Sequence, residues 1–237
     1  MGGGALFFYL SAQLRAQGKT AYLSDVNPEL VNVYQCVRDR VEDLIQQLNA
    51  HQADHCETHY YSVRSQQPTD PVQKAARFIY LNKTCYNGLY RENSKGFFNV
   101  PIGRYKSPKI CAPDLLRPAS AALQIAEIST RPFSTVLARA TTPQDFVYFD
   151  PPYHPLSDTS KFTAYSRYSF AEPQQTALKE AIAQLAQQKV KVLASNSDCA
   201  FIRELYSGFD IKTITAARSI NSKASKRGKI TEVLIIA

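Results

Sequence analysis

The sequence predicts an α/β fold with the order of elements found in a doubly wound sheet. A helix, a strand and a second helix follow one another near the start of the chain, and strands again alternate with a helix after residue 145. The chain has 237 residues, of which 44% are hydrophobic. It can therefore form a full hydrophobic core, either as one large domain or as a core domain with an insertion.

In the first half, residues 4–17 have helical length and precede Gly18, a residue that often ends helices. Residues 19–25 then read as a strand that ends at Asp25. From Pro28 onward, apolar residues recur at intervals of three and four, which predicts one amphipathic helix. These apolar positions are Leu30, Val33, Val37, Val41, Leu44 and Leu48.

In the second half, residues 145–149 (DFVYF) read as a strand. Residues 169–172 (SFAE) form a capping-box pattern that predicts a helix through Leu178, Ile182 and Leu185. A strand is expected at residues 190–195, and two further apolar runs, 211–215 and 232–237, are expected to close the sheet.

Residues 51–144 lack this alternation of predicted helices and strands and are interpreted as an inserted module. Part of it is helical in pattern, and the stretch that follows is rich in Gly, Asn, Pro, Tyr and basic residues. Asn87-Gly88 is a turn signal, so a β-ribbon or an ordered loop is expected there. Residues 1–50 and 145–237 would then form one domain, and residues 51–144 a second.

The net charge of +8 is unevenly distributed. Residues 74–118 contain nine Lys and Arg against two acids, and residues 212–229 contain six against none. Two basic segments on a mildly acidic body favour a polyanion such as nucleic acid as partner, although basic loops also occur on ordinary proteins.

The sequence shows no signal peptide and no apolar run of the length that crosses a membrane. The five cysteines are odd in number and include no Cys-x-x-Cys pair, which favours reduced thiols. We therefore expect an intracellular, cytoplasmic protein without membrane association.

Gly2, Gly3 and Gly4 open the first helix, and Asp25 ends the next strand about 20 residues later. This is the arrangement of an adenosine site, because glycines allow close backbone approach and the acid accepts hydrogen bonds from ribose hydroxyls. Taken alone the pattern is weak. A glycine run is often a linker, and an aspartate at a strand end is often a helix cap.

The motif Asp150-Pro151-Pro152-Tyr153 is more specific. An exocyclic amine such as adenine N6 is a poor nucleophile because its lone pair is delocalised. The Asp150 carboxylate and the Pro151 carbonyl could accept its two hydrogens and free that lone pair, while the Tyr153 ring stacks on the base. The base would first have to leave the duplex. The competing reading is an ordinary turn after a strand.

These residues identify a family. The chain resembles the Dam-type DNA adenine-N6 methyltransferases, which use S-adenosylmethionine, over nearly its whole length. The similar segments occur in the same order and include GGGALFF, LSDVNPELVNVY, NKTCYNGLYRENSKGFFNVPIGRYKSP, YFDPPYHPL and VLASNSD. The resemblance implies a Rossmann-like methyltransferase sheet with an inserted, mostly helical DNA-recognition module that carries a β-hairpin.

By resemblance, Gly2, Gly4, Asp25, Asn27 and Asp150 would bind the cofactor, and Asp150 to Tyr153 would be catalytic. Tyr86 and Asn87 would enter the duplex beside the extruded base. Base edges would be read by Leu89, Arg91 and Pro101, and phosphates would be held by Lys95, Arg104 and Lys106. The hairpin is similar to those of enzymes that modify GATC, so this is the expected target.

The chain departs from the family at its start. Family members carry a Lys-Trp-x-Gly-Gly-Lys-like segment and a first strand before the glycines, whereas this sequence begins at MGGGALFF. We therefore expect that segment to be missing, with a gap in the sheet. A truncated, catalytically inactive DNA-binding homologue is the alternative to the active enzyme.

Enzymes with an acid-Pro-Pro-aromatic motif can also transfer the methyl group to RNA adenine or to cytosine N4. When asparagine replaces the acid, the methyl acceptor can be a protein glutamine. Asp150 and the basic hairpin favour adenine in double-stranded DNA. A cognate restriction enzyme is a possible partner, and no obligate protein partner is implied.

His51, His55 and His59 recur every four residues beside Cys56 and would share one face of a helix. Zinc uses such ligands. The stretch is polar and is interpreted as a loop, and the proposed methyl transfer needs no metal, so no metal site is expected.

Overall fold

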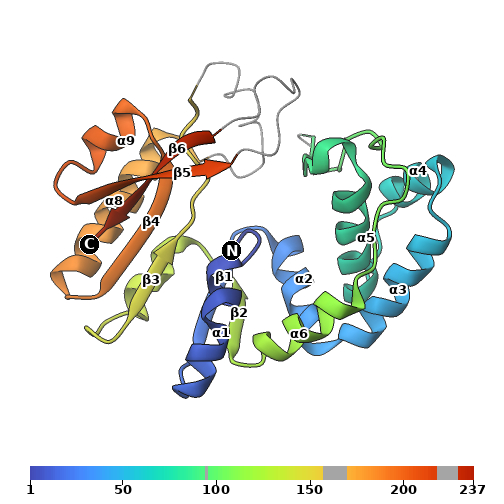
Figure 1. Cartoon of the computed structure of the whole chain (residues 1–237), viewed down its shortest axis with the longest axis horizontal. Coiled ribbons are helices and arrows are strands. Elements are labelled where there is room, and N and C mark those ends of the chain that lie inside the picture. Colours follow the sequence, from blue (N-terminus) through green and yellow to red (C-terminus); the bar gives the residue numbers. More distant parts are fainter. Residues whose placement is uncertain (94–95, 157–169, 218–228) are drawn as a thin grey trace. The chain divides into compact units, whose positions relative to one another are not determined.

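The computed structural model describes residues 1–93, 96–156, 170–217 and 229–237. The chain divides into two compact units, Met1–Arg131 and Pro132–Ala237. Figure 1 shows the helices and strands of both units.

The first unit is mainly helical, with one short parallel sheet. Strands β1 (Ala21–Asp25) and β2 (Ala126–Thr130) pair in parallel, with Leu23 opposite Ile128. The helical elements are α1 (Ala5–Ala16), α2 (Pro28–Asp39), α3 (Val41–Ala53), α4 (Glu57–Ser65), α5 (Pro71–Thr84), the short 3-10 turn η1 (Tyr86–Gly88) and α6 (Pro113–Leu123).

Helix α1 ends as the sequence predicts. Gly18 follows the helix with a φ of +63°, and the Lys19 N–H donates to the Leu14 carbonyl, so the last turn is closed by a left-handed glycine. The strand predicted to end at Asp25 is also confirmed.

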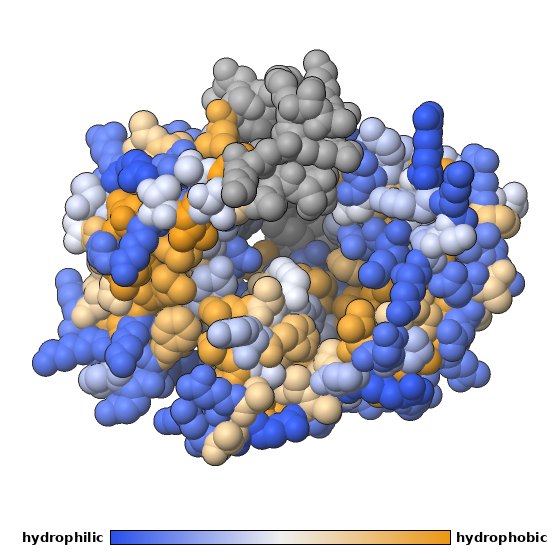
Figure 2. All heavy atoms as spheres, viewed as in Figure 1, coloured by the Kyte–Doolittle hydropathy of each residue, from blue (hydrophilic) through white to orange (hydrophobic). Residues whose placement is uncertain are grey.

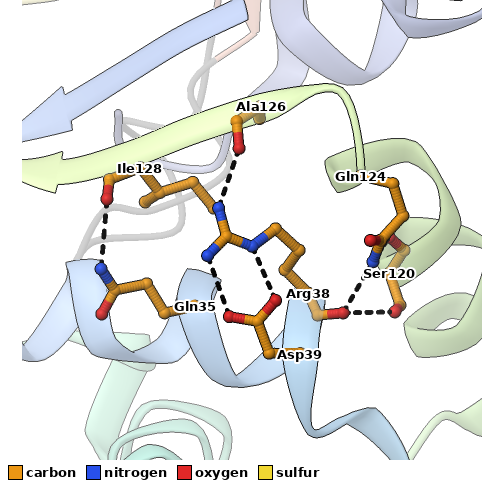
Figure 3. A network of polar contacts seen from close by, with 7 residues as sticks. All are labelled: Gln35, Arg38, Asp39, Ser120, Gln124, Ala126 and Ile128. Carbon is orange, nitrogen blue, oxygen red and sulfur yellow. Dashed lines mark hydrogen bonds and ion pairs between the residues drawn. The ribbon is translucent and has the colours of Figure 1, made fainter.

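Side chains of α2 close the free edge of β2 (Figure 3). Gln35 Nε2 donates to the Ile128 carbonyl at 3.1 Å, and Arg38 Nη1 donates to the Ala126 carbonyl at 2.8 Å. The neighbouring carbonyl of Ile125 instead accepts from β1. Because buried strand carbonyls need partners, these two long side chains replace a third strand at this edge.

The prediction of a single amphipathic helix from Pro28 to Leu48 is wrong, because two helices, α2 and α3, occupy this stretch. Arg40 interrupts them with φ −135° and ψ 37°. The carbonyl of Arg38 at the end of α2 accepts from Ser120 Oγ and Gln124 Nε2 of the α6 region, as Figure 3 shows. Tertiary contacts thus satisfy the end of α2 where the sequence has neither glycine nor proline.

The core of the first unit lies among α2, α3, α4 and α5. Its largest fully buried side chains include Tyr60, Tyr80, Leu44, Leu48 and Leu81. The apolar periodicity therefore identified core residues correctly even where it missed the break between two helices.

The described residues of the second unit form a four-stranded mixed sheet with helices. The strand order in this sheet is β3-β4-β6-β5, in which β3 and β4 are parallel and the other neighbouring pairs are antiparallel. The strands are β3 (Phe146–Phe149), β4 (Lys191–Ser197), β5 (Asp210–Ala217) and β6 (Lys229–Ile236), and the helical elements are η2 (Phe133–Ala138), α8 (Glu172–Gln187) and α9 (Ala200–Leu205).

Helix α8 buries the stripe that the sequence predicts. Leu178, Ile182 and Leu185 pack in one cluster with Val192 of β4 and Val233 of β6. The mixed α/β class and the four strands expected in this half are confirmed.

The start of α8 differs from the capping box predicted at residues 169–172. The N-cap is Ala171, whose N–H donates to Oε1 of Gln174 at 3.0 Å, and the helix begins at Glu172. Gln174, three residues after the N-cap, thus accepts from the N-cap backbone as the third residue of a capping box does. Ser169 lies outside the described residues.

Hydrophilic side chains cover much of the face seen in Figure 2, with hydrophobic ones between them. Within the part of the chain that the structure describes, none of the helices has the length and apolar character needed to cross a membrane.

Candidate active site and DNA-recognition elements

Asp150 lies directly after β3, where the register of the parallel pair brings it beside β4. Its Oδ1 accepts a hydrogen bond of 3.0 Å from Ser195 Oγ, and that hydroxyl also lies 3.1 Å from the Tyr148 hydroxyl. Asp150 is exposed whereas Ser195 is buried. The Asp150 carboxylate is thus exposed to solvent, while one of its oxygens is hydrogen-bonded to the buried Ser195.

Tyr153 contacts Glu232 of β6. Its hydroxyl donates to Glu232 Oε2 at 3.4 Å. Burial raises the pKa of Tyr153 to about 12, and the charges of Glu232 and Asp150 act in the same direction. The phenol therefore stays neutral at physiological pH and keeps its proton as a donor.

The backbone that follows Asp150 is tied to α8 and β4. Gln175 Nε2 donates to the Pro152 carbonyl, the His154 N–H donates to Asn196 Oδ1, and Ser197 Oγ donates to the His154 carbonyl. The sequence analysis did not predict that Gln175, Asn196, Ser197 and Glu232 contact this segment. One pattern could have indicated such contacts, namely the run of polar side chains from Ser195 to Ser197 at the end of an apolar strand.

The glycines form a tight turn at the start of α1. Gly4 is the N-cap of this helix with a φ of +66°, and its N–H donates to the Met1 carbonyl. Tyr34 Oη donates to the Gly2 carbonyl at 2.9 Å. A Cβ added to Gly4 would lie 2.6 Å from that hydroxyl oxygen, so a side chain here would collide with Tyr34.

Asp25 lies at the carboxyl end of β1, close to this turn. Its Oδ1 accepts from the Asn27 N–H and its Oδ2 from the Met1 amino group, both at 2.9 Å. Asn27 caps α2 by accepting from the N–H groups of Glu29 and Leu30. A glycine turn at a helix start beside a strand-end carboxylate fits the adenosine part of a nucleoside cofactor.

Residues 84–93 and 96–103 pair with each other as the arms of an irregular antiparallel hairpin. Cys85 pairs with Ile102 and Glu92 with Phe98, and the Tyr86 N–H donates to the Pro101 carbonyl. Asn87 has a φ of 55°, a conformation that asparagine adopts more readily than most residues.

Most predicted DNA-binding side chains of this hairpin are accessible. Arg91 Nε donates to Asn99 Oδ1 at 2.8 Å, which orients the guanidinium. Lys95 lies outside the described residues, as does most of the second basic segment, residues 218–228. The exposed residues of the predicted set are Tyr86, Leu89, Arg91, Pro101, Arg104 and Lys106.

The interpretation of the histidine-rich stretch as a loop is wrong in part. Residues 51–53 end α3 and residues 57–60 begin α4, while residues 54–56, which include His55, connect the two helices. His51 Nδ1 lies 3.0 Å from His59 Nε2, and His55 Nδ1 lies 2.9 Å from the Tyr80 hydroxyl. The described residues contain no group of three or more His, Cys, Asp or Glu arranged to hold a metal ion. Burial lowers the pKa of His51 to about 4.

Comparison with known proteins assigns the chain to a family. Residues 1–220 match the model of the D12 class N6 adenine-specific DNA methyltransferases. The chain belongs to this family. The D12 methyltransferase is 41% identical over 243 residues to the Type II methyltransferase M1.LlaDCHI of Lactococcus lactis subsp. cremoris, which covers 99% of this chain and 83% of the relative.

Two further relatives are similar over most of their length. Type II methyltransferase M.MjaIII of Methanocaldococcus jannaschii is 40% identical over 250 residues, covering 100% of this chain and 86% of its own. The DNA adenine methylase of Escherichia coli K12 is 37% identical over 219 residues, covering 90% and 78%. These matches support the methyltransferase over the catalytically inactive DNA-binding alternative. The family generally uses S-adenosylmethionine and acts on DNA.

Proposed function

We propose that this D12 methyltransferase transfers a methyl group from S-adenosylmethionine to N6 of an adenine flipped out of double-stranded DNA, with GATC as the target. The observation that carries the proposal is the exposed Asp150 carboxylate, held by Ser195 and followed by the Pro151 carbonyl. Two acceptors on adjacent residues suit the two hydrogens of one exocyclic amine.

In this mechanism, Asp150 and the Pro151 carbonyl accept hydrogen bonds from the amine. Both bonds favour a tetrahedral nitrogen, whose lone pair is then available to attack. The nitrogen would bond to the methyl carbon as the bond from that carbon to sulfur breaks, and the methylated amine would then release one hydrogen as a proton. The Tyr153 ring would stack on the base, and its hydroxyl bond to Glu232 limits rotation of the ring. Flipping the base costs a few kcal/mol, which stacking and the two hydrogen bonds help to offset.

Bound S-adenosylmethionine would supply an electrophilic methyl group. Gly2 and Gly4 would allow its approach to the start of α1, and Asp25 would accept from its ribose hydroxyls. Asn27 would support this site by fixing the chain between Asp25 and α2, and Asp150 would lie beside both cofactor and amine.

Recognition of DNA is proposed for the hairpin. Tyr86 and Asn87 would fill the space left by the flipped base, and Arg91 would contact a guanine through O6 and N7. Leu89 and Pro101 suit thymine methyl groups. Lys95, Arg104 and Lys106 would bind phosphates, which adds affinity without sequence preference.

In this proposal residues 1–50 and 145–237 form a Rossmann-like domain for cofactor binding and catalysis, and residues 51–144 form the recognition module. Two relatives are named Type II methyltransferases, which supports a cognate restriction enzyme as a partner. We place the activity on DNA in the cytoplasm of a prokaryotic-type cell.

The test is transfer of labelled methyl from S-adenosylmethionine to two short duplexes, one containing GATC and one scrambled. Label on the GATC adenine is the expected result. Equal labelling of both duplexes would refute the target sequence, and no transfer to any duplex would refute the proposed function. A single-stranded control with the GATC sequence tests the preference for duplex DNA.

A further inference from the structure

Two buried amide side chains connect α8 and β4 to the backbone of the catalytic motif. Gln175 and Asn196 are 0% and 1% exposed. Asn196 Nδ2 donates to Gln175 Oε1 at 3.0 Å, and Gln175 Nε2 donates to the Pro152 carbonyl at 3.0 Å. On the other side of Tyr153, the His154 N–H donates to Asn196 Oδ1 at 3.0 Å.

The direction of each bond follows from the chemistry of its ends. Asn196 Oδ1 receives two backbone N–H groups, from His154 and Ser197, which can only donate. The Asn196 nitrogen must therefore face Gln175 and donate to its oxygen. That leaves the Gln175 nitrogen for the Pro152 carbonyl, which can only accept, so the chain of bonds has one consistent orientation.

Packing alone does not explain a glutamine at position 175. It lies on the buried stripe of α8 that continues through Leu178, Ile182 and Leu185, where an apolar side chain would fill the same space. A buried amide is unfavourable unless all its groups are paired. Its pairing is with the catalytic segment and Asn196, which indicates that its role is to fix that segment.

The catalytic segment needs such external support. Pro151 and Pro152 have no N–H, so the backbone between Asp150 and Tyr153 offers only carbonyls to its surroundings. Among the described residues the Pro152 carbonyl is bonded to Gln175, while the Pro151 carbonyl has no hydrogen bond. The bond to Gln175 thus holds the carbonyl that directly follows the one to which the proposed function assigns the substrate amine.

We infer that Gln175 and Asn196 are positioning residues for methyl transfer, which hold the Pro151 carbonyl and the Tyr153 ring in the orientation that the flipped base requires. This inference rests on the proposed function. Because the pair lies behind the segment and is buried, it acts on the rate of the chemical step and leaves the binding of DNA and cofactor largely unchanged.

Gln175→Glu gives the sharpest test. The carboxylate keeps an acceptor for Asn196 but cannot donate to the Pro152 carbonyl, whereas a protonated carboxyl can donate. Single-turnover methyl transfer should fall roughly 10- to 100-fold at pH 8 and recover as pH is lowered, because the neutral acid restores the bond. Dissociation constants for the GATC duplex and for cofactor should change less than about twofold.

Gln184→Glu is the matched control, since Gln184 is an exposed residue of the same helix. Every variant keeps three ionisable side chains near the pair: His154 and Glu172, whose Nε2 and Oε1 atoms lie 3.7 Å apart, and Asp150. The pH profile of Gln175→Glu is therefore compared with those of the wild type and of Gln184→Glu, and only Gln175→Glu should gain activity on acidification.

Gln175→Met and hydrogen exchange separate positioning from folding. Exchange of the His154 amide should accelerate in Gln175→Met while the amides of Leu178 and Ile182 keep their protection. A wild-type rate and pH profile in Gln175→Glu, or a rate loss that only follows the loss of folded protein, would overturn the inference. No methyl transfer by the wild type would instead refute the proposed function itself.

Discussion

Replacement of Gly4 by alanine tests whether the turn before α1 is built for a residue without a side chain. Gly4 has a φ of +66°, and an added Cβ would lie 2.6 Å from the Tyr34 hydroxyl oxygen. That hydroxyl donates to the Gly2 carbonyl and therefore cannot move without losing this bond. Gly4→Ala should destabilise the first unit through both effects.

The magnitude follows from the two contributions. A left-handed conformation costs an alanine about 1–2 kcal/mol relative to glycine. Displacement of the Tyr34 hydroxyl loses one hydrogen bond, worth about 1 kcal/mol. Gly4→Ala should therefore lower the free energy of unfolding by about 2–3 kcal/mol in the wild type, but by only about 1–2 kcal/mol in a Tyr34→Phe background, where the hydroxyl is absent.

The assay is urea unfolding of the four proteins in this cycle, monitored by tyrosine fluorescence. Gly3→Ala is the control, because a Cβ on Gly3 would meet nothing within 4 Å. Additive effects of Gly4→Ala and Tyr34→Phe, within about 0.3 kcal/mol, would show that the hydroxyl is no obstacle and would refute the reasoning.

Three further predictions concern catalysis, specificity and pH. Asp150→Ala should reduce methyl transfer roughly 100-fold or more while DNA affinity in a gel-shift assay stays largely intact; normal transfer would contradict the role given to the carboxylate. Arg91→Ala should relax specificity at one guanine by about 1–3 kcal/mol, measured with duplexes substituted at each position, and an unchanged profile would remove Arg91 from base recognition. Burial lowers the pKa of His51 from about 6.5 to about 4, so the unfolded chain binds the extra proton between these values. The free energy of unfolding should fall as pH decreases from about 6.5 to about 4, and His51→Phe should flatten this dependence in urea titrations.

Local patterns in the sequence predicted many elements correctly. Gly18 ends α1, Asp25 ends β1, and the apolar stripe Leu178, Ile182 and Leu185 is buried. These features depend on the conformational preferences of single residues and on helical periodicity, which neighbours along the chain determine.

Breaks and caps fixed by distant residues were not predictable in this way. The helix break at Arg40 carries no glycine or proline, and the end of α2 is satisfied by Ser120 and Gln124, about 80 residues further along the chain. The histidine stretch likewise bends between α3 and α4, where His51 and His59 meet across two helices.

The sequence by itself predicts which groups carry the proposed chemistry of this methyltransferase. Asp150 to Tyr153 place an acid, a carbonyl and an aromatic ring within four consecutive residues, and covalent connectivity alone keeps them together. The tertiary structure decided how they are held. Ser195, Gln175, Asn196 and Glu232 reach the motif from β4, α8 and β6. Hydrogen bonds between residues far apart in the chain depend on strand register and helix packing, which no local pattern encodes.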